Sequence, residues 1–309
     1  MKYTAITSRA PLAKWATPVF ITAVITIFAT LSPLEYVATV RITPYAPVEK
    51  LPEFGFIMPR CVRTPTHNEL WRENYRCIRQ HFPDAPIVII DDHSDMALVD
   101  QNFTMSGVTL IPSNRSAGKG EALPYYYFHE HKPFNKAVML NDGMFILNRE
   151  PLLSAIQNTT DYRFLWDFTR SQAYDSEGQV YLIQTLSTPV QDEIETMRIN
   201  ETSWAGCFAS TAIMTWSFLD HLNATYGFIH MLDAIQNRSH RMGLERLVAL
   251  TSIHSSGMKP LSELSVYGSI FLHRRAFSYG WGDYVHDKMN GTLSNESAIK
   301  IWNGRRRRQ

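Results

Sequence analysis

Two acidic side chains directly follow an apolar segment of the chain. Asp91 and Asp92 come after PIVII at residues 86–90, and a third acid, Asp142, comes after AVMLN at residues 137–141. Short apolar runs rich in β-branched residues are typical of buried strands, so we expect these acids where strands end. Together they would place fixed negative charge at the rim of a binding site. The alternative is that Asp91 or Asp92 only caps the next helix.

The elements that position these acids alternate between strands and helices. A capping box, Thr66 with Glu69, begins a predicted helix that runs to Phe82. The expected strands are residues 54–59, 86–92, 107–112 and 136–142. This alternation across short loops predicts an α/β fold, a three-layer α/β/α sandwich with a mostly parallel central sheet. Ligands bind such sheets at the carboxyl ends of the strands, so the polar residues after three of these strands should form one site.

The pattern is less regular in the second half of the chain. Residues 162–168 and 180–186 are expected as strands, and residues 216–236 and 243–253 as helices. No internal repeat is visible.

Composition excludes several classes of protein. Of the 309 residues, 45% are hydrophobic and 19% are charged, which excludes a disordered chain. The formal net charge of +1 gives no general attraction to nucleic acid, so no nucleic-acid partner is expected. The basic tail at residues 304–309 is interpreted as a solvated end, with contact to phosphate or anionic lipid as the alternative. Cys61, Cys77 and Cys207 lack metal-binding spacing and leave the redox compartment open.

Residues 15–31 form an uncharged apolar segment near the minimum length of a membrane-spanning helix. Basic residues precede it, so the positive-inside rule predicts a cytosolic tail at residues 1–14 and a signal anchor that places the rest of the chain in a lumen. A cleaved signal peptide and a buried helix are the alternatives. The proline-rich residues 32–53 are then a stem, and residues 54–303 the folded domain.

Eight Asn-x-Ser/Thr sequences lie after this segment. They are at Asn102, Asn114, Asn158, Asn200, Asn223, Asn237, Asn290 and Asn295. As a set they favour the secretory pathway, although an Asn-rich sequence also produces them by chance. The predicted location is therefore a single-pass membrane glycoprotein that faces the Golgi or secretory-pathway lumen.

The polar motifs resemble those of the GT-A fold nucleotide-sugar glycosyltransferases. The similar segments are PIVIIDDHSD, SNRSAGKGEA and AVMLNDG, all within residues 54–145. In inverting members of that family, an apolar strand ends in Asp-Asp-x-Ser, a loop with Asn and Gly follows, and a later Asp holds a divalent metal. An anchor, a stem and a luminal domain are also the architecture of Golgi glycosyltransferases. The resemblance implies an enzyme that moves a sugar from a nucleotide-diphosphate sugar to a glycan or other hydroxyl acceptor.

The resemblance also implies roles for single residues in binding the donor. Asp91 or Asp92 would accept a hydrogen bond from the base or ribose, and Gly118 and Gly120 would let the backbone approach a phosphate. The other residues implied to bind the donor are Arg63, Asn114, Lys119, Glu121 and Asn141. The segment GKG is not a phosphate-binding P-loop, because it lacks the P-loop spacing.

Asp142 would face a Mn2+ or Mg2+ ion that neutralises the departing diphosphate. The family pattern is Asp-x-Asp, whereas this chain has NDG with a single carboxylate. One carboxylate with diphosphate oxygens and waters is a reasonable ligand set for such an ion. His286, in GWGDYVHD, resembles a late histidine that completes the site in some members, and its alternative role is structural.

An inverting transfer needs a carboxylate that takes the proton of the acceptor. Glu245, expected one turn into a helix, is the first candidate, and Asp167 in FLWDF is the second. Glu245 has an alternative interpretation as a solvated helix carboxylate. Among the late aromatic residues, Trp204 or Trp281 is expected to stack on an acceptor sugar.

Two other functions fit the same fold. A sugar-1-phosphate nucleotidyltransferase would need a glycine-rich phosphate loop after the first strand, and MPRCVRTPTH contains no glycine. A non-catalytic membrane-anchored binding or scaffold protein would keep the fold and lose the site, and the single acid in NDG favours it. Turnover of a nucleotide sugar distinguishes the enzyme from the scaffold.

Overall fold

The computed structural model describes residues 50–100, 102–169, 177–200, 204–257, 259–273 and 278–302. The described residues from Leu51 on belong to one compact unit. The predicted tail, membrane segment, most of the stem, and the arginine tail lie outside the described residues. Within the described ranges, every helix is too short or too polar to cross a membrane. This finding contradicts the predicted single-pass, lumen-facing location.

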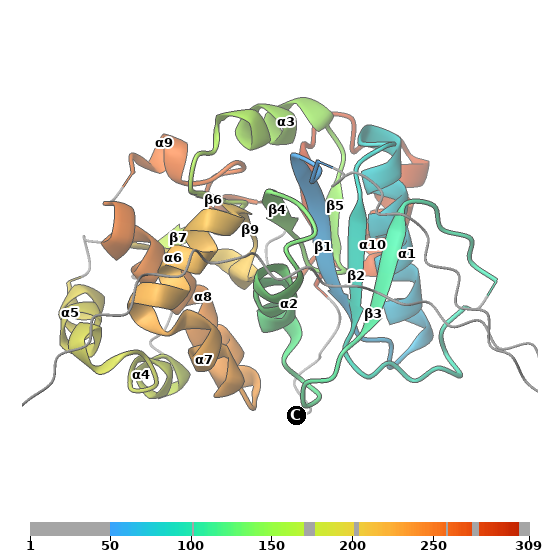
Figure 1. Cartoon of the computed structure of the whole chain (residues 1–309). Helices are drawn as coiled ribbons and strands as arrows, with labels where there is room; N and C mark the ends of the chain where they lie inside the picture. Colours follow the sequence, from blue (N-terminus) through green and yellow to red (C-terminus); the bar gives the residue numbers. More distant parts are fainter. Residues whose placement is uncertain are drawn as a thin grey trace, which may run out of the picture. The chain divides into compact units, whose positions relative to one another are not determined.

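A six-stranded sheet forms the centre of the molecule (Figure 1). In spatial order its strands are β3 (Val108–Pro112), β2 (Ile87–Asp91), β1 (Phe54–Arg60), β4 (Lys136–Met139), β9 (Ala212–Thr215) and β6 (Tyr162–Phe164). The first four run parallel, and β9 runs antiparallel to both of its neighbours. The predicted mixed α/β fold with a mostly parallel sheet is confirmed.

The strand order reverses beside β1. The chain moves outward from β1 to β2 and β3, and then crosses back to form β4 on the other side of β1. In open α/β sheets, the point of reversal leaves a gap between diverging loops at the carboxyl ends of the two strands, where ligands bind. The fold therefore marks the ends of β1 and β4 as the place for a site.

Helices cover both faces of this sheet. Phe56 and Met58 of β1 face one apolar cluster, and Ile57 between them faces another, as the two-residue period of a strand requires. The first cluster includes side chains of α1 (Pro65–His81) and α3 (Arg149–Asn158); the second includes those of α2 (Leu123–His131), α6 (Trp216–Tyr226) and α8 (Arg238–Ser256). In Figure 1, α1 and α2 lie on opposite sides of β1 and β2. Burial on both faces explains the unbroken apolar strands.

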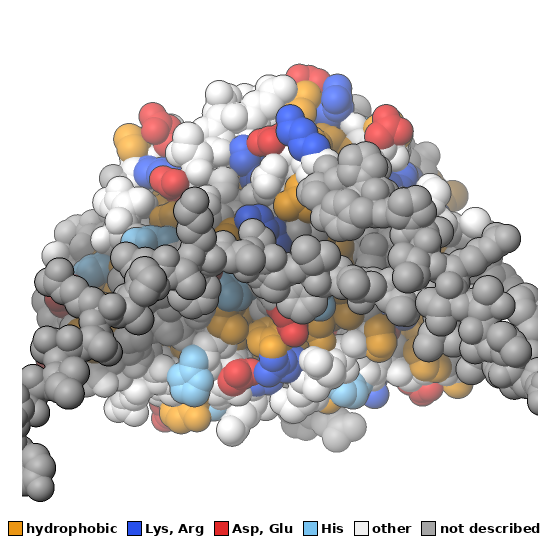
Figure 2. Space-filling view, viewed as in Figure 1, with side chains coloured by type: hydrophobic (Ala, Val, Ile, Leu, Met, Phe, Trp, Pro, Cys, Tyr) orange, Lys and Arg blue, Asp and Glu red, His pale blue; other side chains and the backbone are white. Residues whose placement is uncertain are grey.

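Two small antiparallel sheets and several short helices complete the described fold. β5 (Met144–Ile146) pairs with β10 (Ala298–Lys300), and β7 (Asp167–Thr169) pairs with β8 (Ala205–Cys207). The remaining helices are α4 (Glu177–Ile183), α5 (Thr188–Ile199), α7 (Phe228–Asp233), α9 (Leu261–Leu264), α10 (Trp281–Met289) and the 3-10 helices η1 (Gly120–Ala122), η3 (Phe208–Ser210) and η4 (Ile270–Leu272). On the face viewed in Figure 2, acidic and basic side chains are interspersed, in keeping with a net charge of +1.

Two local predictions are wrong. The cap of α1 is Thr64 rather than Thr66, and its hydroxyl accepts a hydrogen bond from the backbone N–H of His67. Residues 180–186, expected as a strand, lie mostly in helix α4. A short apolar run fits either element, and here close packing on α8 decides: a Cβ added at Gly243 would lie 2.6 Å from the backbone of Gly178 in α4.

Candidate functional site

Residues that follow β1, β2 and β4 meet at one edge of the sheet. Cys61 follows β1, Asp92 follows β2, and Asp142 follows β4. Burial raises the pKa of the Cys61 thiol, and the charges of Asp92 and Asp142 raise it further, so both carboxylates lie near it. The structure thus brings Asp92 and Asp142 together at the point where the strand order reverses.

Asp91 joins the ends of two strands. Its Oδ2 accepts hydrogen bonds from Nε and Nη2 of Arg60, both at 2.7 Å, and its Oδ1 accepts one from the backbone N–H of Ser94 at 2.9 Å. Arg60 is only 3% exposed, and its guanidinium stacks over Trp71. Both oxygens of Asp91 therefore bind protein groups, and the side chain acts as a link between β1 and β2.

Asp92 shapes the glycine loop, which we define as residues 118–121. Its two carboxylate oxygens accept the backbone N–H groups of Gly118 at 3.2 Å and Gly120 at 3.1 Å. Gly118 has φ +88° and Gly120 has φ +49°, a region that side chains with a Cβ enter only at a cost. Because Asp92 occupies these N–H groups, the glycines serve the turn itself, and the loop does not offer the two N–H groups to a phosphate.

Two basic residues hold the glycine loop from its other sides. The Lys119 ammonium donates to the carbonyl oxygens of Leu232 at 3.1 Å and Asp233 at 2.6 Å, at the end of α7. Arg241, in the first turn of α8, donates from Nη1 to the Gly118 carbonyl, and its Nε forms an ion pair with Oε2 of Glu121 at 3.2 Å. The buried Lys119 thus fixes the loop to α7, and its pKa is lowered by burial. These contacts hold the loop in place without a ligand.

Glu245 lies close to this loop, and the pKa of its carboxyl group is raised. It follows Arg241 by one helical turn, on the same face of α8. Burial raises the pKa of Glu245 to about 8; Arg246 lowers this pKa, and the charge of Glu121 raises it further. A carboxyl group with a pKa near neutrality beside other charged groups is typical of a functional site. The helix begins earlier than predicted, so Glu245 lies two turns into it rather than one.

Strained backbone surrounds Glu245. The backbone of Ala209 hydrogen-bonds to the Glu245 carboxyl, and η1 and η3 both pack against α8. Ala209 has φ 52° and Ser210 has φ 53°, and His93, next to Asp92, has φ 57°. Residues other than glycine rarely adopt such angles, each of which costs about 1–3 kcal/mol. The strain is confined by packing, because Ala209 and Ser210 are both buried.

Asp142 shares the electrostatic environment of Glu245. Burial raises the pKa of Asp142, whereas the positive charges of Lys300 and His67 lower it and the charge of Glu121 raises it. Lys300 also lowers the pKa of Glu245. One electrostatic group is therefore formed by the acids Asp142, Glu121 and Glu245 together with Lys300 and His67. These residues are far apart in the sequence.

Three residues of this group were missed by the sequence analysis. His67 lies just after the end of β1, a region already marked by its position, and Arg241 lies one turn before Glu245 on the predicted helix. The position of His67 after a strand and the four-residue spacing of Arg241 and Glu245 can both be seen in the sequence. Lys300 has no such signal, because it reaches the site through the pairing of β10 with β5.

The other predicted donor-binding residues have different surroundings. Arg63 is exposed. Asn114 is exposed too, and its backbone N–H and Oδ1 both hydrogen-bond to the hydroxyl of Tyr127, at 2.9 and 3.0 Å. Asn141 is buried, and its carbonyl accepts a hydrogen bond from Nδ2 of the buried Asn74 at 2.7 Å. Asn114 and Asn141 thus have local structural partners.

Asp167, the second candidate base, is buried in β7. The hydroxyl of Ser265 donates to its Oδ2 at 2.6 Å, and its backbone lies in the β7–β8 ladder opposite Cys207. Burial raises the pKa of Asp167, while the Ser265 hydrogen bond lowers it. Because the Ser265 hydroxyl already occupies one of its oxygens, Asp167 is the weaker candidate for the base.

His286 and the two tryptophans are not brought to Asp142. The His286 side chain is 75% exposed on α10, where it contacts Asp287 and Asn290. Trp204 is buried, with its indole N–H directed to the carbonyl of Arg198, and Trp281 packs edge-on against Phe145. The predicted pairing of Asp142 with His286 is therefore absent from the described structure.

The donor atoms around Asp142 do not fit a divalent ion held by the protein. Among the residues that the structure describes, no group of three or more His, Cys, Asp or Glu side chains is arranged to hold a metal ion. Mn2+ and Mg2+ prefer several oxygen ligands, whereas the groups that act on Asp142 are a single further carboxylate, that of Glu121, the ammonium of Lys300 and the imidazole of His67.

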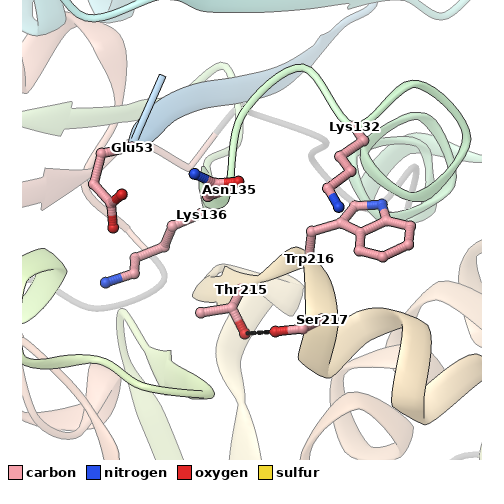
Figure 3. A pocket seen from close by; sticks show the side chains of 7 residues that line it. All are labelled: Glu53, Lys132, Asn135, Lys136, Thr215, Trp216 and Ser217. Atoms are coloured by element: carbon pink, nitrogen blue, oxygen red, sulfur yellow. Dashed lines mark hydrogen bonds between the residues drawn. The ribbon is translucent and has the colours of Figure 1, made fainter. Parts of the chain in front are cut away.

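A pocket of about 300 Å³ lies at the other edge of the sheet (Figure 3). It is lined by Glu53, Lys132, Asn135, Lys136, Thr215, Trp216 and Ser217. Lys136 begins β4, and Asp142 follows that strand, so the pocket and the carboxyl group lie at opposite ends of β4. Its cations have partners: Lys136 donates to the Ile156 carbonyl, and Lys132 lies 3.9 Å from the Trp216 ring.

Comparison with known proteins gives a weak likeness. No family model and no curated protein matches the chain. Similar solved structures include residues 1–349 of TarS from S. aureus, with 13% identity, coverage of 64% of this chain and 56% of that one, and a TM-score of 0.36. They also include mannosyltransferase PcManGT from Pyrobaculum calidifontis in complex with GDP-Man and Mn2+, with 14% identity, 56% and 47% coverage, and a TM-score of 0.34.

A third similar structure is galactosyltransferase LgtC in complex with donor and acceptor sugar analogues, with 11% identity, coverage of 78% of this chain and 96% of that one, and a TM-score of 0.40. The match spans little more than half the length of the TarS structure. Two of the three are named as glycosyltransferases. At these identities and TM-scores the likeness does not decide function.

Proposed function

We propose that the protein is a GT-A-like glycosyltransferase that moves a sugar from a nucleotide-diphosphate sugar to a hydroxyl group of a glycan or another acceptor. One observation carries the proposal: Glu245, a partly buried carboxyl with a pKa of about 8, lies beside the rigid glycine loop and near Asp142 at the reversal of the strand order. Transfer to a hydroxyl group needs such a base at such a place.

The donor binds across the ends of β1 and β4. Its sugar lies toward α8, so that the acceptor hydroxyl lies within hydrogen-bonding distance of Glu245. The glycine loop, held by Asp92, Lys119 and Arg241, keeps this geometry fixed, which lowers the cost of orienting the two substrates.

The transfer is a single displacement. The acceptor oxygen attacks the anomeric carbon of the donor sugar, and its proton passes to the ionised carboxylate of Glu245. The bond between the anomeric carbon and the β-phosphate oxygen breaks, and its electron pair leaves with the nucleoside diphosphate. Attack and departure occur on opposite faces of the carbon, so the configuration inverts. The raised pKa of Glu245 makes its carboxylate a stronger base than an ordinary one.

A non-catalytic binding protein is the second candidate. It is favoured by the partners of Asp91, Asp92, Lys119 and Arg241, all of which bind groups of the chain itself. Such a protein would bind a sugar or a nucleotide without turnover.

The test is a donor screen with a matched pair of variants. The purified protein is incubated with nucleotide sugars and glycan acceptors, and release of nucleoside diphosphate is measured. Glu245→Gln should lower kcat by about 100- to 10,000-fold while donor binding, measured by calorimetry, stays within about threefold. Glu150→Gln changes a carboxylate that is 74% exposed on α3 and should leave both unchanged. Equal turnover by Glu245→Gln and the wild type, or no binding of any nucleotide sugar, would overturn the proposal.

A further inference from the structure

We propose that Lys300 is a further catalytic residue, whose ammonium group neutralises the diphosphate as it leaves, in the place where the family resemblance implies a divalent ion. This inference rests on the proposed function of the same site. It follows from the pairing of β10 with β5, from the alternation of side chains along β10, and from the misfit between the donor atoms around Asp142 and a metal ion.

The pairing of β10 with β5 places Lys300 next to Asp142. Lys300 lies opposite Met144 in the antiparallel ladder, and the backbone N–H of Ile301 donates to the carbonyl of Gly143 at 2.8 Å. Gly143 directly follows Asp142. Neighbouring strands lie about 5 Å apart, so the root of the Lys300 side chain is close to the turn that carries the Asp142 carboxyl group.

The alternation of side chains along β10 directs Lys300 away from the core behind it. Ile299 and Ile301 are 0% and 1% exposed and belong to the cluster that includes Tyr279 and Tyr284 of the C-terminal part. Residues between them in a strand point to the opposite face, so Lys300 points away from that cluster. It is partly exposed, and its charge acts on both Asp142 and Glu245. The charge of Lys300 therefore acts on the two carboxyl groups to which the proposed function assigns roles.

The N-terminal end of α1 supports the same role. His67 lies in the first turn of this helix of 17 residues and acts on the pKa of Asp142, and its Nδ1 accepts a hydrogen bond from the backbone N–H of Arg63. The positive end of the α1 dipole therefore lies near Asp142. Lys300 and this helix end bring positive charge to the only acid of NDG, where the described residues include no group of three or more His, Cys, Asp or Glu side chains arranged to hold a metal.

The chemistry needs positive charge at this place. Negative charge grows on the diphosphate oxygen as the bond to the anomeric carbon breaks, and a preformed cation in a partly buried site stabilises it more strongly than water does. Lysine acts on phosphate as a point charge and needs no particular coordination geometry. Bonds and charges balance in the transfer without a metal ion, because the electron pair leaves with the nucleoside diphosphate and the proton goes to Glu245.

The test uses inorganic pyrophosphate as a probe for the diphosphate, in the presence of EDTA. Its binding to the full chain is measured by calorimetry for the wild type, Lys300→Met, Lys300→Arg and Lys50→Met. We expect wild-type binding in EDTA, a loss of at least tenfold in Lys300→Met, and a change within about threefold in Lys300→Arg. Lys50 is exposed at the start of the described residues, and Lys50→Met should bind like the wild type. Thermal unfolding shows whether Lys300→Met is folded, and Lys300→Arg keeps the test decisive if it is not.

Binding that needs Mn2+ and is unaffected in Lys300→Met would overturn the inference, as would no pyrophosphate binding under either condition. With a donor identified, transfer should continue in EDTA, and Lys300→Met should lower kcat by about 100- to 1,000-fold. A protein that binds pyrophosphate through Lys300 in EDTA but transfers no sugar would remove the proposed function and leave the cation site standing. The two failures are therefore distinguishable.

Discussion

The raised pKa of Glu245 makes the free energy of unfolding depend on pH. Its pKa is about 8 in the folded protein against an ordinary value of 4.5. Between these values the folded state keeps the proton and the unfolded state has lost it, so stability falls as the pH rises through this window and is level above it. Each pH unit corresponds to about 1.4 kcal/mol, so the cost reaches about 3 kcal/mol at neutral pH and about 5 kcal/mol above pH 8.

Glu245→Gln removes this dependence, because an amide does not titrate. Urea unfolding of the variant and the wild type is measured from about pH 5 to about pH 9, and the difference between the two free energies is plotted against pH. The variant should become the more stable protein by an amount that grows with pH up to about 8. Other titrating acids, such as Asp142, largely cancel in the difference. Glu150→Gln, on an exposed carboxylate, should show no such trend. A difference that is independent of pH, or that grows toward acid pH, would refute the assigned environment of Glu245.

The same group should govern the pH dependence of transfer. A general base works only when ionised, so kcat should rise with pH through about 8 in the wild type. At neutral pH, Glu245→Gln should then raise the free energy of unfolding and lower kcat. A gain in stability with a loss of activity is expected when a group is kept for function at a cost in stability.

Three further substitutions test other parts of the site. Arg60→Met leaves the buried Asp91 carboxylate without its ion pair and should lower stability by about 3–5 kcal/mol in urea unfolding; a loss below 1 kcal/mol would contradict the role of this pair. Gly118→Ala forces a Cβ into φ +88° and should cost about 1–2 kcal/mol and weaken donor binding, whereas Gly282→Ala, in α10 with open space around it, should leave both within about 1 kcal/mol of the wild type. Asp167→Asn should lower kcat less than tenfold, because Ser265 still hydrogen-bonds to the side chain. A loss of kcat as large as that of Glu245→Gln would favour Asp167 over Glu245 as the base.

The parallel half of the sheet could be predicted because its strands are buried on both faces. The runs that precede Arg60 and Asp91, and the run that follows Lys136, are apolar without interruption, and the sequence shows this directly. The convergence of Asp92 and Asp142 follows from the same pattern, since parallel strands present their carboxyl ends at one edge.

The partners of the site residues could not be predicted, because they depend on packing between distant segments. Asp92 is predicted to bind a ligand, and the sequence does not show that it also holds the glycine loop or that Lys119 reaches the carbonyl groups of α7, more than a hundred residues away. A sequence pattern reports which face of an element is apolar. It does not report which backbone carbonyl lies opposite a lysine after the helices have packed. The strand expected at residues 180–186 failed for the same reason, because α4 packs its first-turn residues, Gly178 and Gln179, closely against Gly243 of α8.

The ladder between β5 and β10 has a consequence for how the chain acquires its fold during synthesis. Met144–Ile146 emerges from the ribosome long before Ala298–Lys300, its only strand partner among the described residues. Until the later segment arrives, β5 presents unpaired backbone groups, which are a template for association with other chains. The same event that closes this edge delivers the Lys300 ammonium beside Asp142. Closure of the exposed sheet edge and assembly of the charged centre are thus coupled in time. A nascent chain that stops before Ala298 is therefore both prone to association and without its complete charged centre.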